Sequence, residues 1–113
     1  MIMEIQETTQ GAVTVLKPNG PLAQSDAEAF KLRAMEVARR SLGRLLIDAS
    51  AIPFADSQGL ESLVDITESL AQGGRSLKIC MAGATLREVL DLTGWAHAFE
   101  FFDDLTTGVR SFL

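Results

Sequence analysis

Two kinds of hydrophobic pattern alternate along this chain. Short runs rich in apolar and β-branched residues have the length of strands. Between them lie longer segments whose apolar residues recur every three or four positions, as on one face of a helix. The short runs predict strands at residues 3–9, 12–18, 44–50, 76–82 and 98–102. The longer segments predict helices that begin near residues 25, 58, 85 and 104.

Polar residues and glycines mark the ends of the expected helices. Capping residues are predicted at Ser25 with Glu28 and at Thr85 with Glu88, both in capping-box spacing, and at Asp103 or Asp104. Gly73 and Gly74 should end the second helix, because glycine accepts the left-handed conformation of a helix terminus. The inner face of that helix is predicted to carry Leu60, Leu63, Val64, Thr67, Leu70 and Ala71.

The order of these elements, β-β-α-β-α-β-α-β-α, predicts an α/β fold. Strands that alternate with helices imply crossover connections and a mostly parallel central sheet, and the first hairpin adds an antiparallel N-terminal edge. The run "RLLIDAS" is a continuous apolar run with a charged end, which is typical of a central strand buried on both faces. Since no linker, repeat or low-complexity segment interrupts the pattern, we expect a single domain over residues 1–113.

Composition narrows the classes of function. The chain has 15 acidic and 10 basic residues, a net charge of −5, which argues against a nucleic-acid partner. Cys80 is the only cysteine, expected to be a buried thiol, and His97 is the only histidine, so a zinc site lacks ligands. No apolar run is long enough for membrane insertion and no signal peptide is read. We therefore expect a cytoplasmic protein without metal or cofactor.

The motifs of common α/β enzymes are missing. Neither G-x-G-x-x-G nor the phosphate-binding G-x-x-x-x-G-K-[ST] loop occurs, and the pentad from Ala55 to Gly59 lacks the first glycine of a hydrolase elbow. A serine nucleophile would need His97 as its base, and this histidine is better explained as a packed or edge residue. Asp48 and Asp56 are better explained as loop caps than as a metal or acid–base pair. We expect that the protein is not an enzyme.

The sequence Asp56-Ser57-Gln58-Gly59 is the candidate functional site. It follows the central strand and opens a helix, at the sheet edge where α/β proteins bind their ligands. Ser57 is suited to cap this helix, so capping alone could explain it. Alternatively, its hydroxyl is displayed to a partner. Gly59 would then leave backbone open to close approach, and the preceding residues Ile52, Pro53 and Phe54 would hold the loop rigid.

The run "LLIDASAIPFADSQGLESLVDITESLAQGGRSLKI" resembles the STAS domain, specifically the bacterial anti-sigma-factor antagonists. Their pattern is an apolar strand, a short loop, D-S-x-G-L opening a helix, a glycine-rich stop and another strand. The segments "LREVLDLTGWAHAFEFF" and "LKPNGPLAQSDAEAF" are similar to the ending of that family and to its turn before the first helix. The likeness covers nearly the whole chain.

The resemblance implies a partner-switching protein. Such proteins bind a serine kinase of the histidine-kinase-like ATPase type, itself an anti-sigma factor, while unphosphorylated. The kinase phosphorylates the serine that corresponds to Ser57, and the phosphorylated protein is released from the kinase. A PP2C-type phosphatase reverses the reaction. The resemblance assigns partner binding to Asp56, Ser57, Gln58, Gly59 and Leu60, and to Leu22 and Ala23 in the turn before the first helix.

Two other functions remain open. The chain could be a STAS subunit that docks on a transporter ATPase or a signalling scaffold, with the same residues as an unmodified surface. An enzyme or a small-ligand binder is the third alternative.

Overall fold

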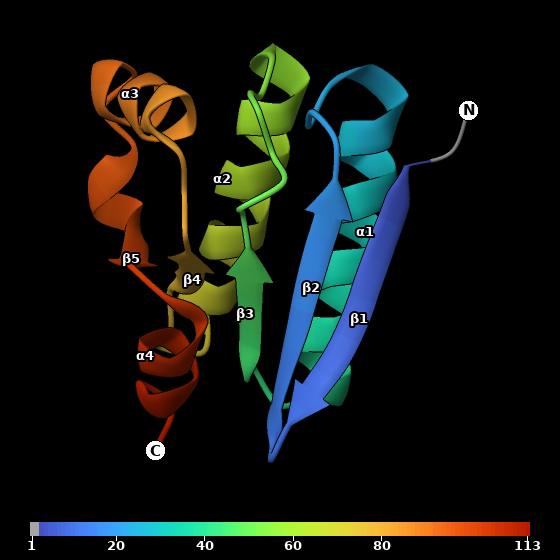
Figure 1. Ribbon diagram of the computed structural model, residues 1–113, viewed down its shortest axis with the longest axis vertical. Helices are drawn as coiled ribbons and strands as arrows, with labels where there is room; N and C mark the ends of the chain where they lie inside the picture. The colour runs from blue at the N-terminus through green and yellow to red at the C-terminus, as the bar shows by residue number, and fades with distance from the viewer. Residues whose placement is uncertain (1–2) are drawn as a thin grey trace.

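The computed structural model describes residues 3–113, and the predicted order of elements is confirmed (Figure 1). The strands are β1 (Glu4–Gln10), β2 (Val13–Asn19), β3 (Leu45–Asp48), β4 (Leu77–Cys80) and β5 (Phe99–Phe102). The helices are α1 (Gln24–Arg40), α2 (Ser57–Ala71), α3 (Ala84–Leu92) and α4 (Leu105–Arg110), with a single 3₁₀ turn, η1 (Ala96–Ala98), before β5.

The five strands form one sheet in the order β1-β2-β3-β4-β5. β1 pairs antiparallel with β2, and the other pairs are parallel, as predicted. Helices α1 and α2 lie behind the sheet in Figure 1 and α4 lies in front of it, so β3 is covered on both faces. All four residues of β3 are buried: the three apolar residues, as the sequence predicts, and Asp48 at its end.

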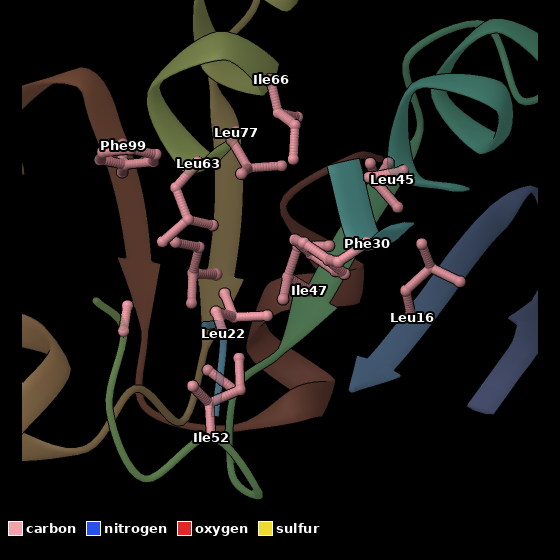
Figure 2. Packing of buried hydrophobic residues seen from close by; sticks show 14 of the residues in the cluster. Leu16, Leu22, Phe30, Leu45, Ile47, Ile52, Leu63, Ile66, Leu77 and Phe99 are labelled. Atoms are coloured by element: carbon pink, nitrogen blue, oxygen red, sulfur yellow. The ribbon is translucent and has the colours of Figure 1, made fainter. Parts of the chain in front are cut away.

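The larger core fills the space between the sheet and helices α1, α2 and α3 (Figure 2). Its fully buried large side chains include Leu16, Leu22, Phe30, Leu45, Ile47, Leu63, Ile66, Leu77, Ile79, Leu86 and Leu90. A smaller core lies under α4, where Leu46 and Cys80 of the sheet contact Leu105 and Val109. Cys80 is buried as expected, and burial raises the pKa of its thiol to about 11.

Neither predicted capping box forms. Helix α1 begins at Gln24, one residue before Ser25, and α3 begins at Ala84 after Gly83; no side chain caps either helix. At α1 the helix begins one residue early because of a contact with a distant segment of the chain. A carboxylate from another loop accepts a hydrogen bond from the Gln24 N–H. At α4 the prediction is confirmed: the Asp104 carboxylate accepts a hydrogen bond from the Thr107 N–H at 2.7 Å, which lowers the pKa of Asp104.

The inner face of α2 is broader than predicted. Leu63, Val64, Thr67 and Leu70 are buried as expected, and Ile66 is buried as well. Leu60 is half-buried and packs against the larger core, whereas Ala71 is exposed, contrary to prediction. Helix α2 packs against both the sheet and α1, so its buried face extends beyond the predicted stripe.

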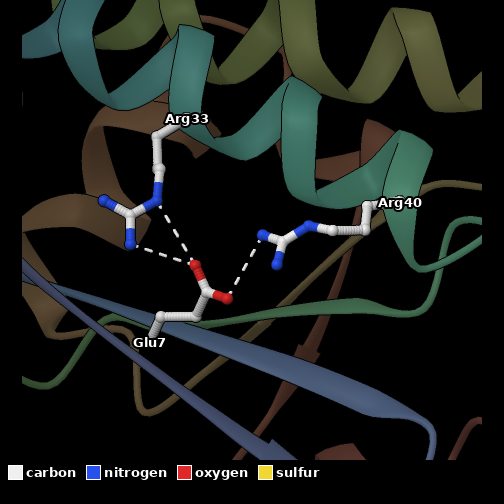
Figure 3. A network of polar contacts seen from close by, with 3 residues as sticks. All are labelled: Glu7, Arg33 and Arg40. Carbon is white, nitrogen blue, oxygen red and sulfur yellow. Dashed lines mark hydrogen bonds and ion pairs between the residues drawn. The ribbon is translucent and has the colours of Figure 1, made fainter.

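A cluster of charged residues ties β1 to α1 (Figure 3). One oxygen of the Glu7 carboxylate accepts from Arg33 Nη2 at 3.0 Å and Nε at 3.3 Å, and the other lies 3.2 Å from Arg40 Nη2. The hydrogen bonds from Arg40 and Arg33 lower the pKa of Glu7 below its ordinary value of 4.5. The arginine side chains are 40% and 55% exposed, so solvent screens these ion pairs.

Replacing Glu7 with glutamine should destabilise the protein at pH 7 by up to about 1 kcal/mol. Because the pKa of Glu7 is lower in the folded state, its stabilisation is complete above pH 4.5 and disappears as the pH falls through the folded-state value. Urea denaturation of Glu7→Gln and of the parent protein should therefore differ at pH 7, and the difference should shrink as the pH falls below 4.5. Glu4→Gln on the same strand is the control, and a difference independent of pH would contradict the prediction.

Candidate functional site

Two loops at the carboxyl ends of β2 and β3 lie side by side at the top of Figure 1. The N–H of Gly20 donates to the carbonyl of Ala51, and the N–H of Leu22 donates to the carbonyl of Phe54, both at 3.1 Å. The carbonyl of Leu22 accepts from the N–H of Asp56 at 3.0 Å. These bonds continue the parallel pairing of β2 and β3 beyond the strands, so the loop that leads to Ser57 has a fixed backbone.

The side chain of Asp56 joins the beginnings of two helices. Its Oδ1 accepts from the N–H of Gly59 at 2.8 Å, which makes Asp56 the N-cap of α2. Its Oδ2 accepts from the N–H of Gln24 at 3.0 Å, at the first residue of α1. The expectation that Ser57 caps α2 is therefore wrong. Asp56 fills this role, and Ser57 is the first residue of the helix and is exposed to solvent.

Gly59 is buried, and it faces another segment of its own chain. A Cβ atom at this position would lie 2.0 Å from the carbonyl oxygen of Leu22 and 2.9 Å from its carbonyl carbon. That oxygen is the acceptor for the Asp56 N–H. The glycine thus allows the loop before α1 to pass close to α2, whereas the sequence had suggested open backbone available to another protein.

The predicted partner-binding residues divide into an outer and an inner group. Ser57 and Gln58 are exposed and Ala23 is half-buried, whereas Leu22 is completely buried beneath them together with Gly59. Asp56 and Leu60, both half-buried, lie between the two groups. The structure thus places the predicted residues in one region but leaves the side chain of Leu22 no access to a partner.

The loop before Ser57 is anchored differently from the prediction. Ile52 and Ala55 are buried, but Pro53 and Phe54 are exposed, and Phe54 retains 45% of its accessible surface. Phe54 is therefore a surface residue of the candidate site that sequence reasoning assigned to loop packing. Its position directly after a proline in a short loop was the available signal, since loop side chains commonly face solvent.

A polar hollow of about 280 Å³ lies beside the serine, between the first halves of α1 and α2. Its lining consists of Gln24, Glu28, Lys31, Gln58, Glu61, Ser62 and Asp65. Lys31 Nζ lies 3.2 Å from Glu28 and 3.3 Å from Asp65, and hydrogen bonds with these two carboxylates raise the pKa of Lys31. With three carboxylates and one ammonium group, the hollow beside Ser57 is negatively charged.

The remaining candidate residues have structural contacts. Asp48 Oδ1 accepts from the Ser50 N–H at 2.9 Å, so Asp48 caps its loop, as expected. His97 is exposed in η1, and its ring stacks on Trp95 with centroids 6.5 Å apart. Within residues 3–113 no group of His, Cys, Asp and Glu side chains is placed to hold a metal ion. No helix in this range has the length and apolarity needed to span a membrane.

The fold and this turn define a small α/β domain with one antiparallel edge strand and a serine displayed at the start of a helix. Residues 4–108 match the STAS domain, and the chain belongs to that family. Among curated proteins no significant match was found.

Solved structures show the same fold. A Thermotoga maritima protein described as a candidate anti-sigma factor antagonist is 19% identical, with a TM-score of 0.85 over 95% of this chain and 92% of that chain. Unphosphorylated SpoIIAA, an anti-sigma factor antagonist, is 14% identical, with a TM-score of 0.74 over 96% of each chain. The murine anion transporter Slc26a9 is 15% identical, with a TM-score of 0.69 over 89% of this chain but only 17% of its own.

Proposed function

We propose that this protein is a cytoplasmic, single-domain anti-sigma-factor antagonist whose binding to a serine kinase is controlled by phosphorylation of Ser57. The observation that carries the proposal is the exposure of Ser57 at the first position of α2, with the capping role taken by Asp56. Membership of the STAS family and the similarity to antagonist structures support it. The Bacillus protein SpoIIAA, which shares this fold, has also been solved in a phosphorylated form.

The proposed partner surface consists of exposed residues around the serine. Ser57, Gln58 and Ala23 would contact the kinase directly, with Phe54 as an additional apolar contact at its edge. Asp56, Gly59 and Leu22 would act from beneath by fixing the loop, and Leu60 would border the contact. The proposal needs no cofactor, no nucleic acid and no membrane insertion, and a PP2C-type phosphatase would restore the hydroxyl.

Phosphorylation at this position should change binding and leave the fold intact. A phosphate group adds a charge of about −1.5 to −2. The N-terminus of α2 favours a nearby anion by about 0.3–1 kcal/mol, so the domain tolerates the modification. In a desolvated interface beside Asp56 and the acidic hollow, the same charge opposes docking, because like charges there cost several kcal/mol.

Ser57→Glu should weaken binding to the cognate kinase by about tenfold or more, while Ser57→Ala should bind like the parent protein. Isothermal titration calorimetry with the purified kinase measures both. Thr106→Glu, an exposed position on α4 at the opposite face of the sheet, is the matched control for added charge and should bind normally. Equal affinity of Ser57→Glu and Ser57→Ala would refute the switch. Turnover of a substrate that His97→Ala abolishes would refute the non-catalytic role.

A second candidate is a STAS subunit that docks on a transporter without being modified. The observation that favours it is the similarity to Slc26a9, in which the matching region is a small part of a transporter chain. Incubation with kinase and ATP followed by intact-mass measurement distinguishes the two functions. One added phosphate, lost in Ser57→Ala, supports the antagonist, whereas an unchanged mass supports docking alone.

A further inference from the structure

A second hollow lies at the far end of the helix pair from Ser57. It occupies about 390 Å³ between the last turns of α1 and α2, and its lining consists of Met35, Ala38, Arg39, Leu42, Gly43, Ser69, Leu70, Gly73 and Arg75. We call this surface the distal groove. Its centre is apolar, through Met35, Ala38, Leu42 and Leu70, and its rim carries two arginines. Leu42, Arg39 and Arg75 are all exposed, so the groove is open to a macromolecule.

Leu42 has an unusual conformation for a leucine at an exposed position. Its φ of +57° is in the left-handed region, and the bond from the Gly43 N–H to the Ala38 carbonyl at 2.7 Å completes a Schellman motif at the end of α1. Glycine is the usual residue here because a side chain is strained in this conformation. Leu42 is 70% exposed, so little burial within the chain compensates for the strain. A binding surface would explain its presence.

The charge of the distal groove is opposite to that of the protein. The chain has a net charge of −5, and the hollow beside Ser57 carries three carboxylates. No carboxylate lines the distal groove, and neither Arg39 nor Arg75 forms an ion pair within residues 3–113. Gly43 leaves room for the Arg75 stem: a Cβ there would lie 2.6 Å from Arg75 Cδ. Two unpaired guanidinium groups therefore flank an apolar centre.

We propose that the distal groove binds an acidic amphipathic helix of a partner protein. Apolar side chains one turn apart would occupy the hollow, and carboxylates beside them would pair with Arg39 and Arg75. The groove lies about 20 Å from the serine site, from the spacing of residues 24 and 38 along α1 at about 1.5 Å per residue. This is about twice the distance over which salt screens a charge, so we expect binding here to be independent of the state of Ser57 and to hold a second protein on the same domain.

The probe is a fluorescein-labelled helical peptide of about four turns, with leucines at i, i+4 and i+7 and glutamates on both sides of that stripe. Fluorescence anisotropy should show saturable binding that weakens as salt is added. The control peptide carries lysines in place of the glutamates and should not bind. Failure of the acidic peptide to bind, or equal binding of both peptides, overturns the proposal.

Variants separate the groove from the stability of the fold. Leu42→Gly should weaken peptide binding about tenfold while its thermal denaturation midpoint is at least that of the parent, because glycine removes the left-handed strain. Arg39→Glu and Arg75→Glu should weaken binding by a similar factor. Leu92→Ala, an exposed leucine at the end of α3, and Arg110→Glu on α4 are the matched controls.

Three results would refute the assignment. The first is unchanged binding in Leu42→Gly and both charge reversals. The second is an equal loss of binding in the two control variants. The third is a sedimentation experiment in which the parent protein dimerises and Leu42→Gly is monomeric, since a second copy of the chain would then occupy the groove. Ser57→Glu should bind the peptide with parental affinity, so a failed kinase experiment leaves this test intact.

Discussion

Replacing Gly59 with alanine should destabilise the protein by about 3 kcal/mol or more, at the upper end of the effects of overpacking. The new methyl carbon would lie 2.0 Å from the Leu22 carbonyl oxygen. No side-chain rotation can separate the two, because the position of each is fixed by the backbone. Relief requires moving the loop before α1, which breaks the bond from the Asp56 N–H to that oxygen. Alanine is otherwise the better helix former, so propensity alone predicts the opposite sign.

Gly73→Ala is the matched control, since a Cβ there would meet only the Leu70 carbonyl oxygen, at an ordinary 3.6 Å. It should leave stability unchanged or raise it by up to about 1 kcal/mol, by restricting the unfolded chain. Urea denaturation monitored by circular dichroism measures both variants. If Gly59→Ala is as stable as Gly73→Ala, the close packing of the loop before α1 against α2 is not a feature of the protein in solution.

Much of the fold could be predicted from the sequence because its local and long-range signals agree. The β3 segment is apolar at its first three positions without alternation, which is typical of a strand covered on both faces. The alternation of strands with helices allows few arrangements other than a parallel sheet with crossover helices. The position of the Asp56–Gly59 turn followed from the same reasoning. In α/β folds, binding sites lie beyond the carboxyl ends of the central strands, and this turn follows the carboxyl end of β3.

The details of the site depend on contacts between distant segments, which the sequence does not display. A serine after an aspartate can be read as a cap from either residue, and the Gln24 N–H, far away in the chain, takes part in the outcome. A glycine in a first helical turn does not indicate which segment packs against it. The sequence therefore did not show that Gly59 faces Leu22. Likewise, no local pattern reveals that Leu42 is left-handed, because leucine rarely adopts that conformation.

These contacts explain how one short turn can be both rigid and available. Hydrogen bonds between the loops and the buried side chain of Leu22 fix the backbone of the turn. Because Gly59 has no side chain, the Leu22 segment can pack closely beneath it. The hydroxyl of Ser57 and the amide of Gln58 are consequently positioned without being consumed by internal contacts. A docking partner then loses little entropy in ordering this surface, which favours affinity.

Asp56→Ala should destabilise the protein by about 3 kcal/mol, the second large effect that the structure predicts. Loss of an N-cap side chain costs about 1 kcal/mol, and a hydrogen bond to a charged group contributes about 1.5–3 kcal/mol. Asp56 makes one bond of each kind, to Gly59 in α2 and to Gln24 in α1. Its removal therefore frees both helix beginnings and loosens the loop that presents Ser57.

Asp56→Asn separates the two contributions, because asparagine is an equally good N-cap but has one carbonyl oxygen, which can satisfy only one of the two donors. It should cost about 1–2 kcal/mol, less than alanine at the same position. Asp104→Ala is the control for capping alone, since Asp104 caps α4 through a single bond to the Thr107 N–H, and it should cost about 1 kcal/mol. Chemical denaturation of the three variants gives the order Asp56→Ala, Asp56→Asn, Asp104→Ala. If Asp56→Ala is no worse than Asp104→Ala, the carboxylate is an ordinary cap, and the bond to Gln24 contributes nothing to holding the two helices together.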